Sequence, residues 1–169
     1  MPATQKSPKT QLRNNYEAIQ MKYDYMIAGR WRNRDEIRKV LDKVRAAGRT
    51  AYCFIENDYN GDGIWIDTKN GANIEEFMQN LENTPDWQSN PTFKKIYDKD
   101  MNGIKDAKEF LLVFPAGLSG HMELGAAYGM GKKCYAIGRP DKYETLYLML
   151  DSLHDTVDDF LQIRHGVTL

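Results

Sequence analysis

The chain has 169 residues, of which 41% are hydrophobic and 28% are charged, and its formal net charge is -1 at pH 7. This length predicts one domain with a sizeable core, and the balanced charge excludes the strong positive field that recruits nucleic-acid polymers or anionic membranes. Two cysteines cannot form a disulfide framework, no apolar run approaches the roughly 20 residues of a membrane span, and the first residues contain no apolar signal segment. We therefore expect a cytoplasmic, globular protein.

The predicted elements alternate between strands and helices. Residues 1–20 are polar and are expected to form a flexible arm, which leaves 21–169 as the domain. Short runs of apolar and aromatic residues predict buried strands at 23–28, 51–55, 109–114 and 133–137. Apolar residues at helical spacing predict helices over 35–47, 74–81, 92–108, 121–130, 143–153 and 156–164. This order predicts an α/β fold of the Rossmann or flavodoxin-like kind, with an open, mainly parallel sheet of four or five strands flanked by helices.

In such a sheet, ligands bind beyond the carboxyl ends of the strands, and the segment after the first predicted strand is rich in cations. It contains Arg30, Arg32 and Arg34 beside Trp31. These residues either form a solvated start of the next helix or bind a ligand, since arginine offers forked donors to phosphate and tryptophan offers a face for a base.

The segment after the third predicted strand is a turn of small residues that leads into a helix and carries Glu123 in its first turn. One interpretation is a glutamate that complements the helix dipole beside a Ser119 cap. The other is a nucleophile or acid–base group whose pKa is changed by burial in a crevice. His121 lies in the same segment and is a candidate for ligand contact.

A third pattern is rich in aspartate. Residues 98–109 match the spacing of an EF-hand calcium loop, and residues 58–63 repeat its first half. Lys105 occupies a position that is normally aliphatic, and Glu109 leads directly into a predicted strand. A calcium-binding module is therefore kept only as the less favoured alternative. The chain has no cysteine and histidine cluster at zinc spacing and no phosphate-loop motif, so we predict neither a metal nor a cofactor.

Three segments, in order along the chain, resemble the nucleoside 2-deoxyribosyltransferase family and its relatives that hydrolyse deoxynucleoside 5′-monophosphates. They are YDYMIAGRWRNRDE (23–36), DMNGIKDAKEFLLVF (100–114) and GHMELGAAYGMGKKCYAI (120–137). The resemblance implies cleavage of the N-glycosidic bond of a small-molecule nucleoside or nucleotide through a covalent glycosyl ester. A second base would then give transfer, and water would give hydrolysis. The resemblance also implies a homodimer or a larger homo-oligomer.

Carried over by position, the resemblance makes Glu123 the nucleophile, Asp100 the group that manages the proton of the leaving base, and Tyr25 the residue that orients Glu123. The chain lacks the additional aspartate that such transferases carry shortly before the nucleophile. A nucleotide hydrolase is therefore favoured over a transferase, and a non-catalytic nucleotide sensor on the same fold remains the alternative. The residues expected to contact substrate are Ala28, Gly29, Arg30, Trp31, Gly117, Ser119, Gly120, His121 and Met122.

Overall fold

The centre of the molecule is a five-stranded parallel sheet, seen in a computed structural model that describes residues 21–57 and 74–169. Its strands stand in the order β2-β1-β3-β4-β5, and every neighbouring pair is parallel. This arrangement confirms the predicted α/β fold. The predicted arm at 1–20 lies outside the described residues. The strands are β1 (Tyr23–Ala28), β2 (Ala51–Cys53), β3 (Ala107–Val113), β4 (Lys133–Ile137) and β5 (Ser152–His154).

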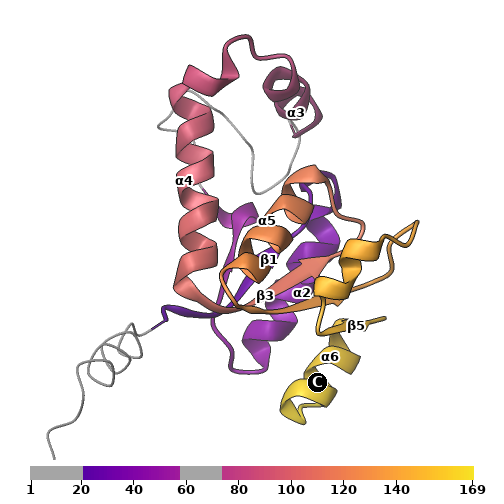
Figure 1. Cartoon of the computed structure of the whole chain (residues 1–169). Coiled ribbons are helices and arrows are strands. Elements are labelled where there is room, and N and C mark those ends of the chain that lie inside the picture. The colour runs from indigo at the N-terminus through magenta and orange to yellow at the C-terminus, as the bar shows by residue number, and fades with distance from the viewer. Residues whose placement is uncertain (1–20, 58–73) are drawn as a thin grey trace, which may run out of the picture.

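Helices cover both faces of the sheet (Figure 1). The helices α2 and α6 pack on one face with Tyr25 and Ile27 of β1, whereas α4 and α5 pack on the other with Met26 and Ala28. Successive side chains of a strand point to opposite faces, so a strand that is covered on both sides is apolar throughout. The helices are α2 (Arg34–Ala46), α3 (Ile74–Glu82), α4 (Pro91–Asp106), α5 (Leu118–Gly129) and α6 (Val157–His165). The 3-10 turns are η1 (Trp31–Asn33), η2 (Phe54–Glu56), η4 (Trp87–Ser89) and η5 (Thr145–Met149).

Local sequence signals fix the ends of two helices that lie far apart in the chain. The side chain of Asn90 accepts hydrogen bonds from the backbone N–H groups of Thr92 and Phe93 at the start of α4. Thr156 accepts one from the backbone of Asp159 at the start of α6, which ends at Gly166 with a φ of 65°. Side-chain acceptors satisfy N–H groups that the first helical turn leaves unpaired, and glycine adopts the left-handed conformation without strain.

The helix predicted over 143–153 is wrong. The segment forms the turn η5 and then β5, which pairs with β4. The backbone N–H of Asp151 donates to the carbonyl of Cys134 at 2.7 Å, and the Asp151 carboxylate accepts from the N–H of Cys134 at 2.9 Å. The edge of β4 thus offers hydrogen-bond partners to the backbone of this segment, which therefore forms a strand and not a helix. The predicted strand at 51–55 is also shorter, because Phe54 begins η2.

A crevice lies between the carboxyl ends of β1 and β3, where the chain direction across the sheet reverses. From β1 the chain crosses to β2 on one side, and from β3 it crosses to β4 on the other. Two glycines allow close packing here. A Cβ atom at Gly29 would lie 2.6 Å from Cδ1 of Ile37, and one at Gly120 would lie 3.1 Å from the carbonyl oxygen of Gly29. Ligands of open α/β sheets bind at this topological position.

Replacement of Phe160 by alanine should strongly destabilise the fold. The side chain is fully buried, and its ring centroid lies 5.6 Å from those of Tyr25 and Tyr135. The resulting cavity should lower the free energy of unfolding by about 3–5 kcal/mol, measured by urea denaturation. Ile163→Ala on the same helix is the matched control, because Ile163 is 71% exposed. Equal losses for the two variants would contradict the packing described here.

Candidate active site

A cavity of about 510 Å³ occupies the crevice at the ends of β1 and β3. Its walls come from the segment after β1, from the loop before α5, and from α3, α4 and α5. In Figure 1, α3 lies beyond the sheet, apart from the helices that cover its two faces. The cavity therefore collects side chains from segments that are separated by almost 100 residues in the sequence.

Two buried carboxyl groups line this cavity. Asp100 comes from α4 and Glu123 from α5, and these two helices pack against each other. Burial raises the pKa of Asp100 to about 6. Burial also raises the pKa of Glu123 well above its ordinary value, and the negative charge of Asp100 adds to that shift. Ionisation of one carboxyl opposes ionisation of the other, so the arrangement favours a pair that shares one proton.

Asp100 has a hydrogen-bond partner that the sequence analysis missed. The hydroxyl of Tyr52 donates to Oδ1 of Asp100 at 3.2 Å, and this bond lowers the pKa of Asp100 against the larger effect of burial. Tyr52 lies in β2, on the face of the sheet that α4 covers. In the sequence, Tyr52 is an aromatic residue in a predicted strand next to the site. An ordinary core residue has the same pattern, so the sequence did not single it out.

Apolar and aromatic side chains make up much of the remaining lining, together with the ion-paired Arg32 and Glu82. The ring of Trp31 meets that of Phe54 edge-on, with centroids 5.1 Å apart and an interplanar angle of 90°. Phe77 is buried against Trp31, Met78 and Leu81, so α3 contributes to this wall. A molecule with a flat apolar part and a polar part would match this mixed lining.

The arginines after β1 have different roles. Arg30 and Arg32 both line the cavity. Arg32 forms a two-pronged ion pair with Glu75 of α3, with both N···O distances at 2.8 Å. Arg32 also lies 3.6 Å from Glu82. It therefore links α3 to η1, whereas Arg34 lies 3.6 Å from the carboxylate of its neighbour Asp35.

The structure brings seven of the predicted site residues together at this cavity and places five elsewhere. Ala28 is buried in the sheet, Gly120 packs against the carbonyl oxygen of Gly29, and Met122 is exposed on α5. The residues that line the cavity are Gly29, Arg30, Trp31, Asp100, Gly117, Ser119 and Glu123.

The predicted contact between Tyr25 and Glu123 is wrong. The hydroxyl of Tyr25 lies 2.8 Å from Nε2 of His165 in α6, on the face of the sheet opposite α4 and α5. Burial raises the pKa of Tyr25, and the nearby carboxylate of Glu109 adds to the shift. Because side chains alternate along a strand, Tyr25 faces α6 whereas Met26 and Ala28 face the helices that carry the two carboxyl groups.

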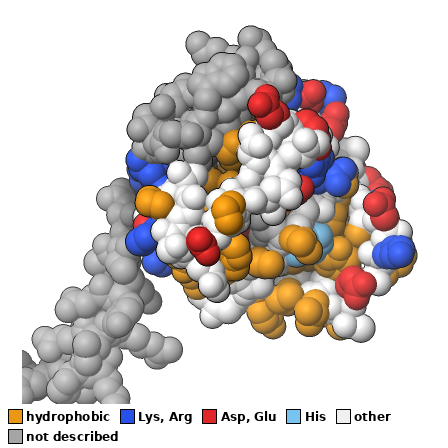
Figure 2. Space-filling view, turned by 90° about the horizontal axis from the view of Figure 1, so that it is seen from above, with side chains coloured by type: hydrophobic (Ala, Val, Ile, Leu, Met, Phe, Trp, Pro, Cys, Tyr) orange, Lys and Arg blue, Asp and Glu red, His pale blue; other side chains and the backbone are white. Residues whose placement is uncertain are grey.

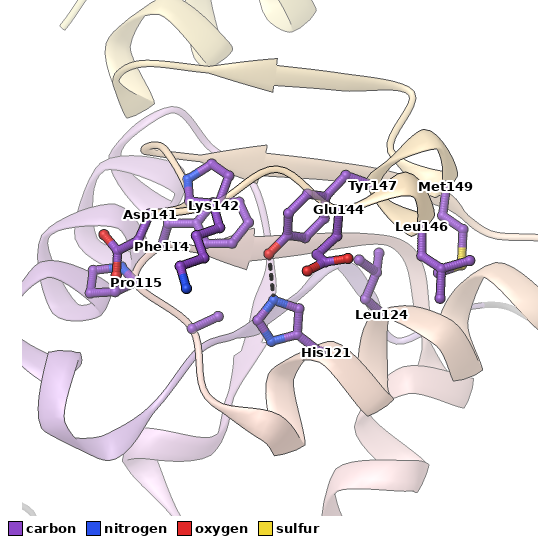
Figure 3. A pocket seen from close by; sticks show the side chains of 12 residues that line it. Phe114, Pro115, His121, Leu124, Asp141, Lys142, Glu144, Leu146, Tyr147 and Met149 are labelled. Atoms are coloured by element: carbon purple, nitrogen blue, oxygen red, sulfur yellow. Dashed lines mark hydrogen bonds between the residues drawn. The ribbon is translucent and has the colours of Figure 1, made fainter.

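His121 lines a second cavity of about 590 Å³ instead (Figure 3). Its Nδ1 lies 2.7 Å from the carbonyl oxygen of Gly117, and its Nε2 lies 2.9 Å from the hydroxyl of Tyr147. A carbonyl oxygen only accepts, so Nδ1 carries a hydrogen and donates it to Gly117. His121 therefore ties η5 to the residue that precedes α5, and Gly117 lines the first cavity.

The less favoured alternative of a calcium loop at 98–109 is wrong, because these residues lie in α4 and β3 rather than in a loop. The partial match at 58–63 falls outside the described residues. Within 21–57 and 74–169, no group of three or more histidine, cysteine, aspartate or glutamate side chains is placed to hold a metal ion. In the same parts of the chain, no helix has the length and apolar character needed to cross a membrane.

Solved structures with similar folds include an enzyme and a receptor domain. A 2-deoxyribosyltransferase from the psychrotolerant bacterium Bacillus psychrosaccharolyticus is 15% identical, with a TM-score of 0.54 over 84% of this chain and 93% of that one. The TIR domain of a Toll-related receptor from Hydra magnipapillata is also 15% identical, with a TM-score of 0.51 over 84% of this chain and 90% of that one. No protein-family model and no curated protein matches the chain. At this identity the shared feature is the fold.

Asp100→Asn should change how stability depends on pH. The pKa of Asp100 is about 6 in the folded protein and about 3.9 in an unfolded chain. As the pH rises, the unfolded chain therefore releases this proton at a lower pH than the folded protein does. The free energy of unfolding of the wild type should fall by on the order of 2 kcal/mol relative to that of the variant between about pH 4 and about pH 6. Urea denaturation across this range measures the difference.

Asp98→Asn is the matched control, because Asp98 lies on the same helix and pairs with Lys94 at 2.8 Å on the surface. This variant should follow the wild-type dependence on pH. Parallel curves for the wild type and Asp100→Asn would show that the Asp100 carboxyl is not buried as described.

Proposed function

We propose that the protein cleaves the N-glycosidic bond of nucleosides or their 5′-monophosphates, with Glu123 as the nucleophile and Asp100 as the acid that protonates the leaving base. The observation that carries the proposal is the buried pair of carboxyl groups in a cavity that aromatic side chains also line. Cleavage of a glycosidic bond passes through an oxocarbenium-like state, which two adjacent carboxyl groups are suited to stabilise and to protonate.

In the proposed reaction, a carboxylate oxygen of Glu123 attacks the anomeric carbon as the bond from that carbon to the base nitrogen breaks. The electron pair of the broken bond stays on the base, which takes the proton of Asp100. Glu123 then holds the sugar as an ester, and a second base or a water molecule attacks the anomeric carbon to release it. The chemistry requires Glu123 to be ionised while Asp100 is protonated. In the substrate-free cavity the pKa of Glu123 is the more strongly raised of the two, so substrate binding has to move the shared proton from Glu123 to Asp100 before attack begins.

The walls of the cavity suggest how such a substrate would be held. The rings of Trp31 and Phe77 provide an apolar surface for the base. The helix α5 begins after Gly117 without a side-chain cap, and Ser119 lies in its first turn. Uncapped N–H groups at a helix start favour anions, and Arg30 lines the same cavity. These features support binding of a 5′-phosphate next to the sugar.

The fold neighbour and the segment before α5 bear on which acceptor takes the sugar. The fold neighbour that is a 2-deoxyribosyltransferase supports glycosyl transfer as the broad class of reaction. The segment from Pro115 to Gly120 has no carboxylate to read a base, and this composition favours water as the acceptor. The reaction as written uses only the side chains of this chain and requires no cofactor.

Glu123→Gln should abolish release of base. A panel of ribo- and deoxyribonucleosides and their 5′-monophosphates, with and without an acceptor base, is incubated with the protein, and products are separated by chromatography. The variant should lose at least about 1,000-fold in kcat, because an amide is not a nucleophile. The intact mass of acid-quenched wild type should show the added sugar. Glu36→Gln, which removes an exposed carboxylate paired with Lys39 on α2, should keep full activity.

Unchanged turnover in Glu123→Gln would reject the assigned nucleophile. Binding of nucleotides without turnover of any member of the panel would instead favour the nucleotide sensor, because such a protein would use the cavity for recognition alone.

We also propose that the protein forms a homodimer or a larger homo-oligomer. Hydrophobic side chains are visible on the face shown in Figure 2. Leu118 and Met122 of α5 are 80% and 71% exposed, and Leu148 of η5 is 90% exposed. Because α5 and η5 contact each other, these exposed apolar side chains lie on neighbouring elements, as is typical of interfaces.

Replacement of Leu148 and Met122 together by glutamate should lower the mass measured by light scattering to that of the monomer, because charge at the centre of an apolar interface is costly. The control is Ile163→Glu, an equally exposed apolar position on α6, which should leave the mass unchanged. A monomeric wild type would contradict the proposed oligomer.

A further inference from the structure

We propose that Tyr52 is a positioning residue for the acid of the reaction. Its hydroxyl holds Oδ1 of Asp100, which leaves the transferable proton on Oδ2, and it stabilises the carboxylate that forms when this proton moves to the leaving base. The inference rests on the proposed function and extends it to a residue outside the substrate cavity.

The direction of the hydrogen bonds follows from the groups involved. Nδ2 of Asn57 donates to the hydroxyl oxygen of Tyr52 at 2.8 Å. The hydroxyl of Tyr52 in turn donates its hydrogen to Oδ1 of Asp100 at 3.2 Å. A tyrosine hydroxyl has one hydrogen, and an amide NH₂ group can only donate. The chain from Asn57 to Tyr52 to Asp100 therefore has one direction, and it ends on a carboxyl oxygen that accepts.

This direction decides which oxygen of Asp100 carries the proton. A hydrogen on Oδ1 would compete with the hydrogen of Tyr52 for the space between the two oxygen atoms. The neutral acid therefore carries its hydrogen on Oδ2 while Oδ1 accepts. When the proton leaves, the bond from Tyr52 becomes a bond to a charged acceptor, which is stronger than a bond between neutral groups. The product of proton transfer is thus stabilised more than the starting acid.

A glycine in the middle of α4 makes this contact possible. A Cβ atom at Gly103 would lie 2.4 Å from both Cδ1 and Cε1 of the Tyr52 ring, so the ring occupies the place where any other residue would have its side chain. Asp100 and Gly103 are three residues apart and share one face of the helix. A glycine inside a helix costs about 1 kcal/mol relative to alanine, and the close approach of Tyr52 explains why this position needs one.

The charged and titratable groups around Asp100 come from three elements. Burial raises its pKa, whereas the hydrogen bond from Tyr52 in β2 and the positive charge of Lys99 in α4 lower it. Glu123 of α5 is the facing carboxyl, and its own pKa is raised in part by the charge of Asp100. Loss of the Tyr52 hydroxyl therefore removes one of the two opposing effects and should raise the pKa of Asp100.

Tyr52→Phe tests the inference, because it keeps the ring next to Gly103 and removes only the hydroxyl. We expect kcat to fall by about 10- to 100-fold, as for loss of a hydrogen bond to a charged group, while KM changes less than twofold. The descending limb of the pH profile should move to higher pH, because Asp100 keeps its proton longer. The loss should shrink for a substrate whose leaving group needs no protonation.

Tyr23→Phe is the matched control, since its ring lies 6.0 Å from that of Tyr52 and its hydroxyl has no role in the proposal. It should keep both kcat and the pH profile of the wild type. Gly103→Ala is a second variant, which changes the surroundings of the Tyr52 ring and keeps its hydroxyl. It displaces the ring and should give the same shift of the descending limb as Tyr52→Phe.

A ¹³C NMR titration of the Asp100 carboxyl separates this inference from the proposed function, because it needs no substrate. A higher pKa in Tyr52→Phe than in the wild type supports the contact. If the contact is present but no substrate is cleaved, the role of Tyr52 in positioning an acid is overturned together with the proposed function. Cleavage of substrate with an unchanged carboxyl titration and an unchanged pH profile in Tyr52→Phe would overturn the inference alone.

Discussion

The burial of two carboxyl groups in one cavity is the constraint on which the site depends. Water stabilises ionised carboxylates, and a protein that removes it must hold the groups partly protonated or supply other partners. Here α4 and α5 each contribute one acid, and Tyr52 donates to one of them. The close packing at Gly29, Gly103 and Gly120 brings the supporting segments near enough for this arrangement. The glycines of the site therefore affect the pKa values of the two carboxyl groups indirectly, because they allow the segments that carry these groups and Tyr52 to pack closely.

The start of α5 separates two cavities and organises both. Glu123 faces the cavity at the end of β1, whereas Leu124 and His121 line the second one. The hydrogen bonds of His121 to Gly117 and Tyr147 connect η5 to the first turn of this helix. The first two turns of α5 thus hold the uncapped N–H groups, the contact of His121 with η5 and, in the second turn, the proposed nucleophile Glu123.

The fold alone does not decide the chemistry. A glycosyl-transferring enzyme and a receptor domain share it with this chain at the same low identity, and an α/β sheet of this kind supports unrelated functions. The proposed glycosidic chemistry therefore depends on the side chains at the carboxyl ends of the strands. A pair of carboxyl groups with raised pKa values beside an aromatic wall is a specific arrangement, whereas the sheet that carries it is common.

Local pattern in the sequence determined most of the architecture. The runs at 23–28 and 133–137 match β1 and β4, because a strand buried on both faces leaves a continuous apolar signature. Gly29 and Glu123 are candidates because of their places after predicted strands, and Asp100 is a candidate through the family resemblance. The structure brings all three to one cavity. Relations across the sheet were decided only in three dimensions. Tyr25 faces α6 because side chains alternate between the two faces of a strand. Residues 152–154 form a strand because β4 offers an open edge. Tyr52 reaches Asp100 because a glycine 51 positions later in the chain leaves room for its ring. A single sequence records which side chains are present, but the face that each one takes depends on neighbours that are distant along the chain.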